Sequence, residues 1–174
     1  AGATTDQLGA NPAEALIRSL GDWALRFLCL TLAVTPLRTI TRTPQLLRFR
    51  RMLGLFVFFY ASAHLLAYGW LDMGLDVADI GRDILKRPFI LVGFGTWLLL
   101  LPLALTSSNR MVRALGGPQW QALHRLVYVI AGLALLHFFW MRSGKHDYAE
   151  VGWYAVMIAS LLGWRAYRWL LPKE

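Results

Sequence analysis

Five apolar segments limit most strongly what this chain can fold into. In chain order they cover residues 23–37, 52–71, 89–105, 126–141 and 151–164, the last with an aromatic tail through Trp169. A helix needs about 20 residues to cross the roughly 30 Å of hydrocarbon in a bilayer. Two segments reach or approach that length, and flanking Trp, Tyr and Arg side chains can extend the other three to the membrane surface. The sequence therefore predicts an all-α, polytopic transmembrane bundle with five spanning helices.

Composition agrees with a membrane protein and excludes several kinds of chemistry. Of the 174 residues, 57% are hydrophobic and only 16% are charged, whereas soluble domains carry about 25% charged residues. The single cysteine, Cys29, leaves no intrachain disulfide, four-thiolate zinc site or iron–sulfur cluster held by this chain alone. Basic residues sit in short gaps between apolar runs and form no sustained basic stripe, so we expect no nucleic-acid partner.

The basic residues instead predict how the helices are oriented, because Lys and Arg accumulate on the cytoplasmic side of a membrane. The loops at 38–51 and 106–125 and the C-terminal tail together hold eleven basic residues and one acidic residue. The opposite side holds seven basic and nine acidic residues. This alternation predicts that the arginine-rich loops face the cytoplasm and that the first residues lie outside.

Two further expectations follow from this topology. Residues 1–21 contain no apolar core of a signal peptide and no initiating Met, so we expect another spanning helix upstream of residue 1. Between the second and third apolar segments, Val77, Ile80, Ile84 and Leu85 recur at helical spacing among charged residues. That pattern predicts a short amphipathic helix on the outer membrane surface, as a connector or as a docking platform.

Three histidines fall in or beside the predicted spans, where ionisable residues are costly and commonly functional. His64 lies 13 residues beyond Arg51, and His137 lies 13 residues beyond His124, each about 20 Å along a helix. Both helices run outward, so His64 and His137 are expected at one depth. They could bind one b-type haem from opposite sides as axial ligands to its iron. The fourth histidine, His146, is expected in a solvated outer loop.

The residues expected near the cytoplasmic ends of these two helices allow more than one interpretation. His124 has no histidine opposite it, only Arg50 and Arg51, which could pair with haem propionates or an anionic headgroup. A second haem with a single histidine ligand is one possibility. A quinone or flavin pocket that also uses Gln121 is another, and an interfacial histidine among lipid headgroups is a third.

Several segments resemble one known family. They read RRMLGL at 50–55, AH at 63–64, WQALHRLVY at 120–128 and LHF at 136–138. These segments resemble the MsrQ family, the haem-binding membrane subunits of the periplasmic protein-methionine-sulfoxide reductase, within the wider ferric-reductase-like transmembrane group. The resemblance runs through essentially the whole chain, so residues 1–174 are expected to form a single ferric-reductase-like transmembrane haem domain.

The resemblance implies a multi-pass inner-membrane electron-transfer subunit. Such a subunit takes electrons from the quinone pool, carries them through b-type haem and passes them to a periplasmic molybdopterin-containing reductase. That partner, not this chain, reduces the methionine sulfoxide and so repairs oxidised periplasmic proteins. His64, His124 and His137 carry over as haem ligands. Flavin mononucleotide (FMN) is also associated with the family, although no residue here marks its site.

Two other functions remain open on the sequence. A cytochrome b anchor for a different periplasmic oxidoreductase would share the same histidines, since partner identity depends on the outer loops. A cofactor-free membrane scaffold or transporter would use the histidines for packing or translocation. Such a transporter is expected to show inverted internal repeats, and none is visible between the first and last pairs of segments.

Overall fold

The computed structural model describes residues 11–144 and 148–170, and this part of the chain is helical without any strand. The helices are α1 (Pro12–Thr41), α2 (Leu47–Ala67), α3 (Val77–Lys86), α4 (Pro88–Leu105), α5 (Asn109–Leu115), α6 (Gly117–His124), α7 (Leu126–Ser143) and α8 (Ala149–Leu170). A short 3-10 turn, Pro44–Leu46, precedes α2, and a π-helical turn, Tyr68–Asp72, continues it. The predicted all-α fold is confirmed.

Local signals in the sequence set the ends of several helices. The Asn11 side chain accepts a hydrogen bond from the backbone N–H of Glu14 and caps α1, while Pro12 occupies the first turn. The Asp76 carboxylate caps α3 by accepting from the N–H groups of Ala78 and Asp79. Ser108 caps α5 in the same way. These caps satisfy N–H groups that the first turn of a helix leaves without partners.

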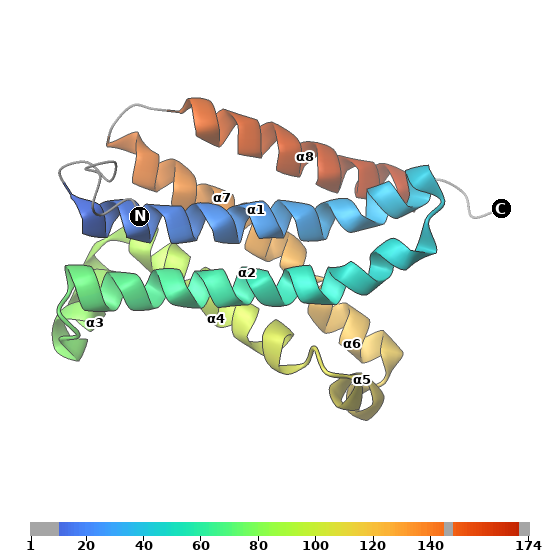
Figure 1. The fold of residues 1–174 in the computed structure, drawn as a ribbon, viewed down its shortest axis with the longest axis horizontal. Helices are drawn as coiled ribbons and strands as arrows, with labels where there is room; N and C mark the ends of the chain where they lie inside the picture. Colours follow the sequence, from blue (N-terminus) through green and yellow to red (C-terminus); the bar gives the residue numbers. More distant parts are fainter. Residues whose placement is uncertain (1–10, 145–147, 171–174) are drawn as a thin grey trace.

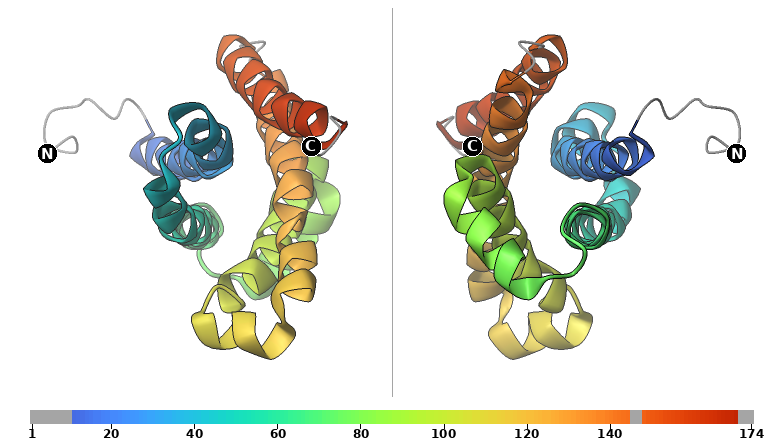
Figure 2. Two further views of the ribbon diagram at one scale, coloured as in Figure 1. Left: turned by 90° about the vertical axis from the view of Figure 1, so that its right-hand side faces the viewer. Right: turned by 90° about the vertical axis from the view of Figure 1, so that its left-hand side faces the viewer.

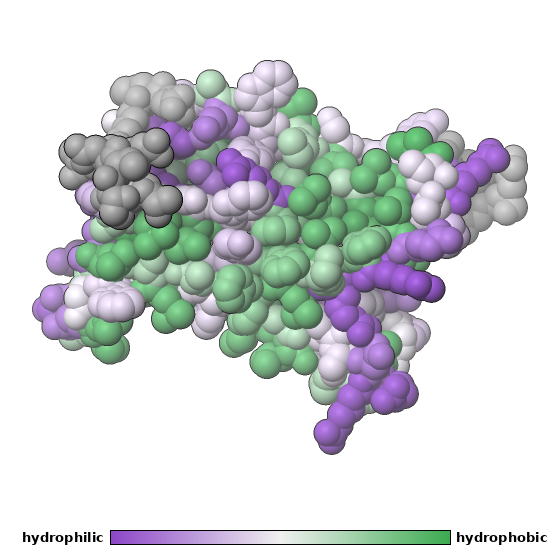
Figure 3. All heavy atoms as spheres, viewed as in Figure 1, coloured by the Kyte–Doolittle hydropathy of each residue, from purple (hydrophilic) through white to green (hydrophobic). Residues whose placement is uncertain are grey.

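Four helical stretches are long and apolar enough to cross a membrane: Pro12–Thr41, Pro44–Asp72, Pro88–Leu105 and Gly117–Ser143. They contain the first four predicted apolar segments. The fifth segment lies in α8, which has 22 residues and lies alongside α1 and α7 (Figure 1). Its lower apolarity leaves the fifth crossing as a prediction. Hydrophobic side chains form a broad band between more hydrophilic ends of the molecule (Figure 3).

The chain forms two helix pairs with α8 added along one side. Viewed along the bundle, α1 packs with α2, and α4 packs with α7 on the opposite side (Figure 2). Two polar contacts attach α8 to α1: the Arg26 Nε donates to the Tyr154 hydroxyl at 3.4 Å, and Arg165 donates to the Leu32 carbonyl. We call the end with α3 the outer end and the arginine-rich end with α5 and α6 the inner end, following the predicted orientation.

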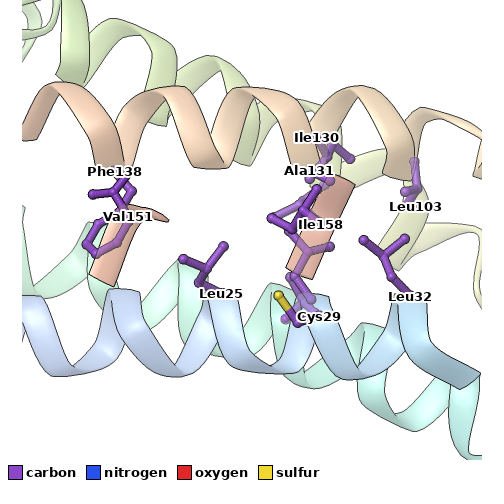
Figure 4. Packing of buried hydrophobic residues seen from close by; sticks show 12 residues of the cluster. Leu25, Cys29, Leu32, Leu103, Ile130, Ala131, Phe138, Val151 and Ile158 are labelled. Atoms are coloured by element: carbon purple, nitrogen blue, oxygen red, sulfur yellow. The ribbon is translucent and has the colours of Figure 1, made fainter. Parts of the chain in front are cut away.

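The buried core lies where α1, α7 and α8 meet (Figure 4). Leu32 of α1 and Ile130 of α7 are its largest fully buried side chains. Val57 of α2 and Leu100 of α4 complete it from the other two long helices. Many other large apolar side chains are exposed, as expected for helices whose outer surface contacts lipid instead of water.

The connecting segments contain more helix than the sequence indicated. The predicted amphipathic helix is present as α3, but the loop at 106–125 is expected as a polar connection and instead folds into α5 and α6. Gly116 separates these two helices with a φ of 75°, a conformation that favours glycine. Both helices carry polar and basic side chains between their apolar ones, which obscures their periodicity in the sequence.

Candidate functional site

Two of the predicted histidines meet in the middle of the outer half of the bundle. His64 projects from α2 and His137 from α7, and the centres of their imidazole rings are 6.2 Å apart. The ring planes are inclined by 78°. Because α2 and α7 both run from the inner to the outer end, the equal depth expected from the sequence is what brings these two side chains together.

A backbone carbonyl from a neighbouring helix orients each ring. Nδ1 of His64 lies 2.8 Å from the Ile17 carbonyl oxygen of α1, and Nδ1 of His137 lies 2.6 Å from the Phe89 carbonyl oxygen of α4. A carbonyl can only accept, so each Nδ1 carries the proton and donates. The proton-free Nε2 is then the nitrogen available to a metal, which is the arrangement typical of metal-binding histidines.

Two glycines make room for these rings. A Cβ atom placed on Gly93 of α4 would lie 2.7 Å from both Cε1 and Nδ1 of His137. A Cβ on Gly21 of α1 would lie 3.2 Å from Nδ1 of His64. Any side chain at Gly93 would therefore displace the His137 ring, and Gly21 leaves almost as little space. Each histidine ring therefore lies against the bare backbone of a neighbouring helix.

A cavity of about 510 Å³ surrounds the histidine pair. Helices α1, α2, α4 and α7 all contribute to its wall. Its deeper part is apolar, with Leu25, Leu28, Val57, Leu100 and Ile130. Its outer part is polar, with Asn11, Glu14, Arg18, Asp22, Tyr68, Asp72 and Arg87. We call this space the outer cavity.

A hydrogen-bonded cluster links the outer part of this cavity to α3. The Tyr68 hydroxyl donates to the Asp83 carboxylate at 2.5 Å, and the Arg87 guanidinium donates to both oxygens of the same carboxylate. Donation from Arg87 holds the pKa of Asp83 below its usual range, and the hydrogen bond from Tyr68 adds to this effect against the opposing effect of burial. The outer cavity therefore has a fixed polar rim.

The geometry of the histidine pair suits one particular metal group. Two imidazoles that each bond at about 2 Å to one iron between them have ring centres about 6 Å apart. The described residues contain no cluster of three or more His, Cys, Asp or Glu that could hold a bare metal ion. Two neutral imidazoles in an apolar cavity therefore fit a metal whose other ligands come from a flat macrocycle, as in haem.

A second, inner cavity of about 270 Å³ brings together three of the remaining predicted site residues. His124, Arg50 and Arg51 line it, together with Trp120, and no acidic residue of the described part of the chain does. Nδ1 of His124 donates to the Trp120 carbonyl at 3.0 Å, and the two rings stack with centres 3.9 Å apart. Nε2 of His124 is buried and makes no hydrogen bond with any described residue.

The structure around His124 differs from two of the expectations from the sequence. Gln121 is exposed and does not line the inner cavity, although the sequence grouped this residue with His124. His124 and His137 do not lie on one uninterrupted helix, because the helix is interrupted at Arg125 between α6 and α7. The predicted solvated residue His146 lies outside the described residues.

The two cavities share one wall. Leu28 of α1, Val57 of α2 and Leu100 of α4 line both of them. The polar ends of the cavities therefore point toward opposite ends of the bundle, and their apolar ends meet at these three side chains. Gly21, Gly93 and the carbonyls of Ile17 and Phe89 are the functional groups that sequence reasoning missed, because contacts between helices leave no local pattern.

The chain is similar to known membrane proteins along most of its length. Residues 20–135 match the family described as ferric reductase like transmembrane component. This match covers two thirds of the chain and includes His64 and His124 but stops just before His137. The comparison with solved structures gave no significant match.

Individual relatives are more similar still. A protein of Polaromonas naphthalenivorans (strain CJ2) is 67% identical over 95% of this chain and 75% of its own length. A protein of Herminiimonas arsenicoxydans is 54% identical over 98% of this chain and 78% of its own length. Another from Xanthomonas campestris pv. campestris (strain B100) is 51% identical over 98% of this chain and 77% of its own length. Each is named "Protein-methionine-sulfoxide reductase heme-binding subunit MsrQ".

Proposed function

The chain belongs to the ferric-reductase-like transmembrane family, within its MsrQ group, and we propose that it is the haem-binding membrane subunit that supplies electrons to a protein-methionine-sulfoxide reductase. The observation that carries this proposal is the pair His64 and His137, with ring centres 6.2 Å apart in an apolar cavity. The relatives' name gives the reductase context. The predicted topology puts the histidine pair in the outer half of an inner-membrane protein, nearer a periplasmic molybdopterin-containing partner.

Each residue of the outer site has a distinct role in this proposal. Nε2 of His64 and Nε2 of His137 would hold the iron of a b-type haem. The Ile17 and Phe89 carbonyls fix the tautomers of these imidazoles. Gly21 and Gly93 let the rings approach the backbone, while the apolar wall excludes water. When bound, haem supplies an iron that carries one electron at a time.

The inner cavity is proposed as the place where a quinol from the membrane binds. It is about half the volume of the outer cavity and lies at the inner membrane surface of the predicted topology. Nε2 of His124 can accept a hydrogen bond from a quinol hydroxyl. Arg50 and Arg51 add positive charge, and no acidic residue among those described lines the cavity. The shared wall of Leu28, Val57 and Leu100 separates this donor site from the outer cavity.

The visible spectrum of the purified protein, expressed with sufficient haem, tests the central claim. We expect a Soret band that shifts on reduction with dithionite, and we expect His64→Ala and His137→Ala each to abolish the same low-spin signal. His124→Ala is the matched control and should retain that signal. A colourless wild-type preparation would instead support a cofactor-free scaffold, and survival of the signal in either variant would disprove the pairing.

The inner site has its own test, in the haem-loaded protein reconstituted into nanodiscs. We expect a short-chain quinol to reduce the haem of the wild type rapidly, and His124→Ala to slow this reduction at least tenfold while dithionite still reduces it fully. Gln121→Ala is the control, because Gln121 lies outside the cavity. Equal rates in all three proteins, or loss of half the haem in His124→Ala by pyridine haemochrome assay, would contradict the quinol site. Half loss would indicate a second haem at His124.

A further inference from the structure

The outer cavity is polar at one end only, and this asymmetry defines how an amphipathic ligand can enter it. On the inner side of the histidine pair the lining is mostly apolar and ends at Leu28, Val57 and Leu100; the Thr96 hydroxyl there donates to the Val92 carbonyl of its own helix. On the outer side the lining includes Arg18 and Arg87. Arg18 precedes Gly21 by three residues and Arg87 precedes Gly93 by six, which is about 4.5 and 9 Å of helical rise toward the outer end.

A b-type haem has a matching asymmetry, since two propionate carboxylates extend from one edge and only hydrocarbon groups from the opposite edge. Burying a carboxylate in the aliphatic part of the cavity would be costly. We propose that the outer cavity binds haem with its propionate edge toward the outer end, and that Arg18 and Arg87 are the residues that bind the two propionates. This inference rests on the proposed haem function and adds the orientation of the group and two binding residues.

Both arginines are already arranged to bind carboxylates. Arg18 pairs with Glu14 on α1, and Arg87 pairs with Asp83 on α3. A guanidinium has five N–H donors, so each arginine can keep its present partner and bind a second carboxylate. The Tyr68 hydroxyl, which donates to Asp83, fixes the position of this pair. Tyr68 and Asp83 are thus positioning residues for Arg87.

The acidic residues near Arg18 and Arg87 make these two arginines necessary for binding a propionate at this end of the cavity. Glu14, Asp22 and Asp72 line the same end of the cavity and would repel a propionate. Arg18 and Arg87 are the only Lys or Arg side chains in the lining of the outer cavity among the described residues. Removing one of them should therefore weaken haem retention by more than the loss of a surface ion pair.

Haem transfer to excess apomyoglobin measures this retention directly. We expect Arg18→Gln and Arg87→Gln each to release haem at least tenfold faster than the wild type. Both should also have a lower midpoint potential, since a nearby positive charge favours the ferrous form. Arg82→Gln is the matched control: Arg82 lies on α3, pairs with the exposed Asp79 and does not line the cavity. Its release rate should stay within twofold of the wild type.

A second arm keeps the test valid if a variant folds poorly. The wild type is loaded with the iron complex of protoporphyrin IX dimethyl ester, in which both carboxylates are neutralised. We expect this diester to be released at least tenfold faster than haem, and the arginine variants to add little further loss. Release of haem from both arginine variants at the Arg82→Gln rate, or equal retention of haem and diester, would overturn the inference. A wild type that binds no haem would instead overturn the proposed function.

Discussion

Two backbone carbonyls determine what the central histidines can do. An imidazole whose Nδ1–H donates to the Ile17 or Phe89 carbonyl cannot turn away without leaving that N–H unsatisfied in an apolar environment. Each ring is thus held with Nε2 free. The sequence identifies His64 and His137 and their common depth. It cannot identify the carbonyls, which come from residues 47 and 48 positions away.

The single substitution Gly93→Ala should disrupt the proposed haem site. The new methyl carbon would lie 2.7 Å from the His137 ring, so the ring must move and lose its bond to the Phe89 carbonyl. We expect at least tenfold weaker haem retention, about 1.4 kcal/mol or more. Gly95→Ala lies two residues away in α4, where a Cβ meets nothing within 4 Å.

Both substitutions exchange glycine for alanine inside one helix, so both gain similar helix propensity. The difference between them isolates the contact with His137. Haem content by pyridine haemochrome, together with the low-spin absorption band, measures that difference. If Gly93→Ala and Gly95→Ala retain haem equally, the close approach of α4 does not control the His137 ring.

At the scale of elements, α3 is joined to the bundle through one carboxylate. Asp83 receives hydrogen bonds from Tyr68 at the end of α2 and from Arg87 at the start of α4. Its amphipathic sequence predicts that α3 lies on a membrane surface. Only the folded chain shows that α3, through Asp83, is hydrogen-bonded to Tyr68 and Arg87, which line the polar end of the outer cavity.

These hydrogen bonds to Asp83 predict that the attachment of α3 to the bundle depends on pH. The pKa of Asp83 is lowered in the folded protein, so the ionised carboxylate stabilises the attachment of α3. This stabilisation is complete when the pH is above the ordinary Asp pKa of about 3.9, and it is lost as the pH falls through the lowered pKa of the folded state. At neutral pH, Asp83→Asn should weaken the attachment of α3 by about 1.5–3 kcal/mol, the range for hydrogen bonds to charged groups.

Hydrogen exchange of residues 77–86, corrected for intrinsic rates, measures this attachment. The wild type should lose protection in a step below pH 4, and Asp83→Asn should show weak protection without that step. Asp79→Asn is the control, because the Asp79 carboxylate pairs with the exposed Arg82 on the same helix. A step of equal size in the wild type and in Asp83→Asn would assign the pH dependence to another group.

At the scale of the whole molecule, charge should determine how the bundle is inserted. The inner-side loops and tail hold eleven basic residues against one acidic residue. This asymmetry predicts Gly74 outside and Gly116 inside. If α8 crosses the membrane as the fifth span, the chain after Leu170 is inside as well.

Fusions of alkaline phosphatase and of green fluorescent protein at these three positions test the topology. Phosphatase should be active only at Gly74, and fluorescence should appear only at Gly116 and after Leu170. An active phosphatase after Leu170 would mean that α8 lies against α1 and α7 without crossing the membrane. The Gly74 and Gly116 fusions serve as internal controls for the first four crossings.

The amino-acid sequence alone indicates the five apolar helices, their order and the depth of the histidines, whereas the short helices α5 and α6 appear only in the folded chain. Membrane-spanning helices satisfy their own backbone hydrogen bonds, so their signals are local: apolar length, caps and flanking charge. Lateral contacts between helices carry no such signal. Only the tertiary structure shows the two cavities and the glycines that lie against the histidine rings. It alone also shows that Gln121 lies outside the inner cavity and that the outer cavity has a polar rim of Arg18, Tyr68 and Arg87. Each depends on how four helices rotate and pack against one another.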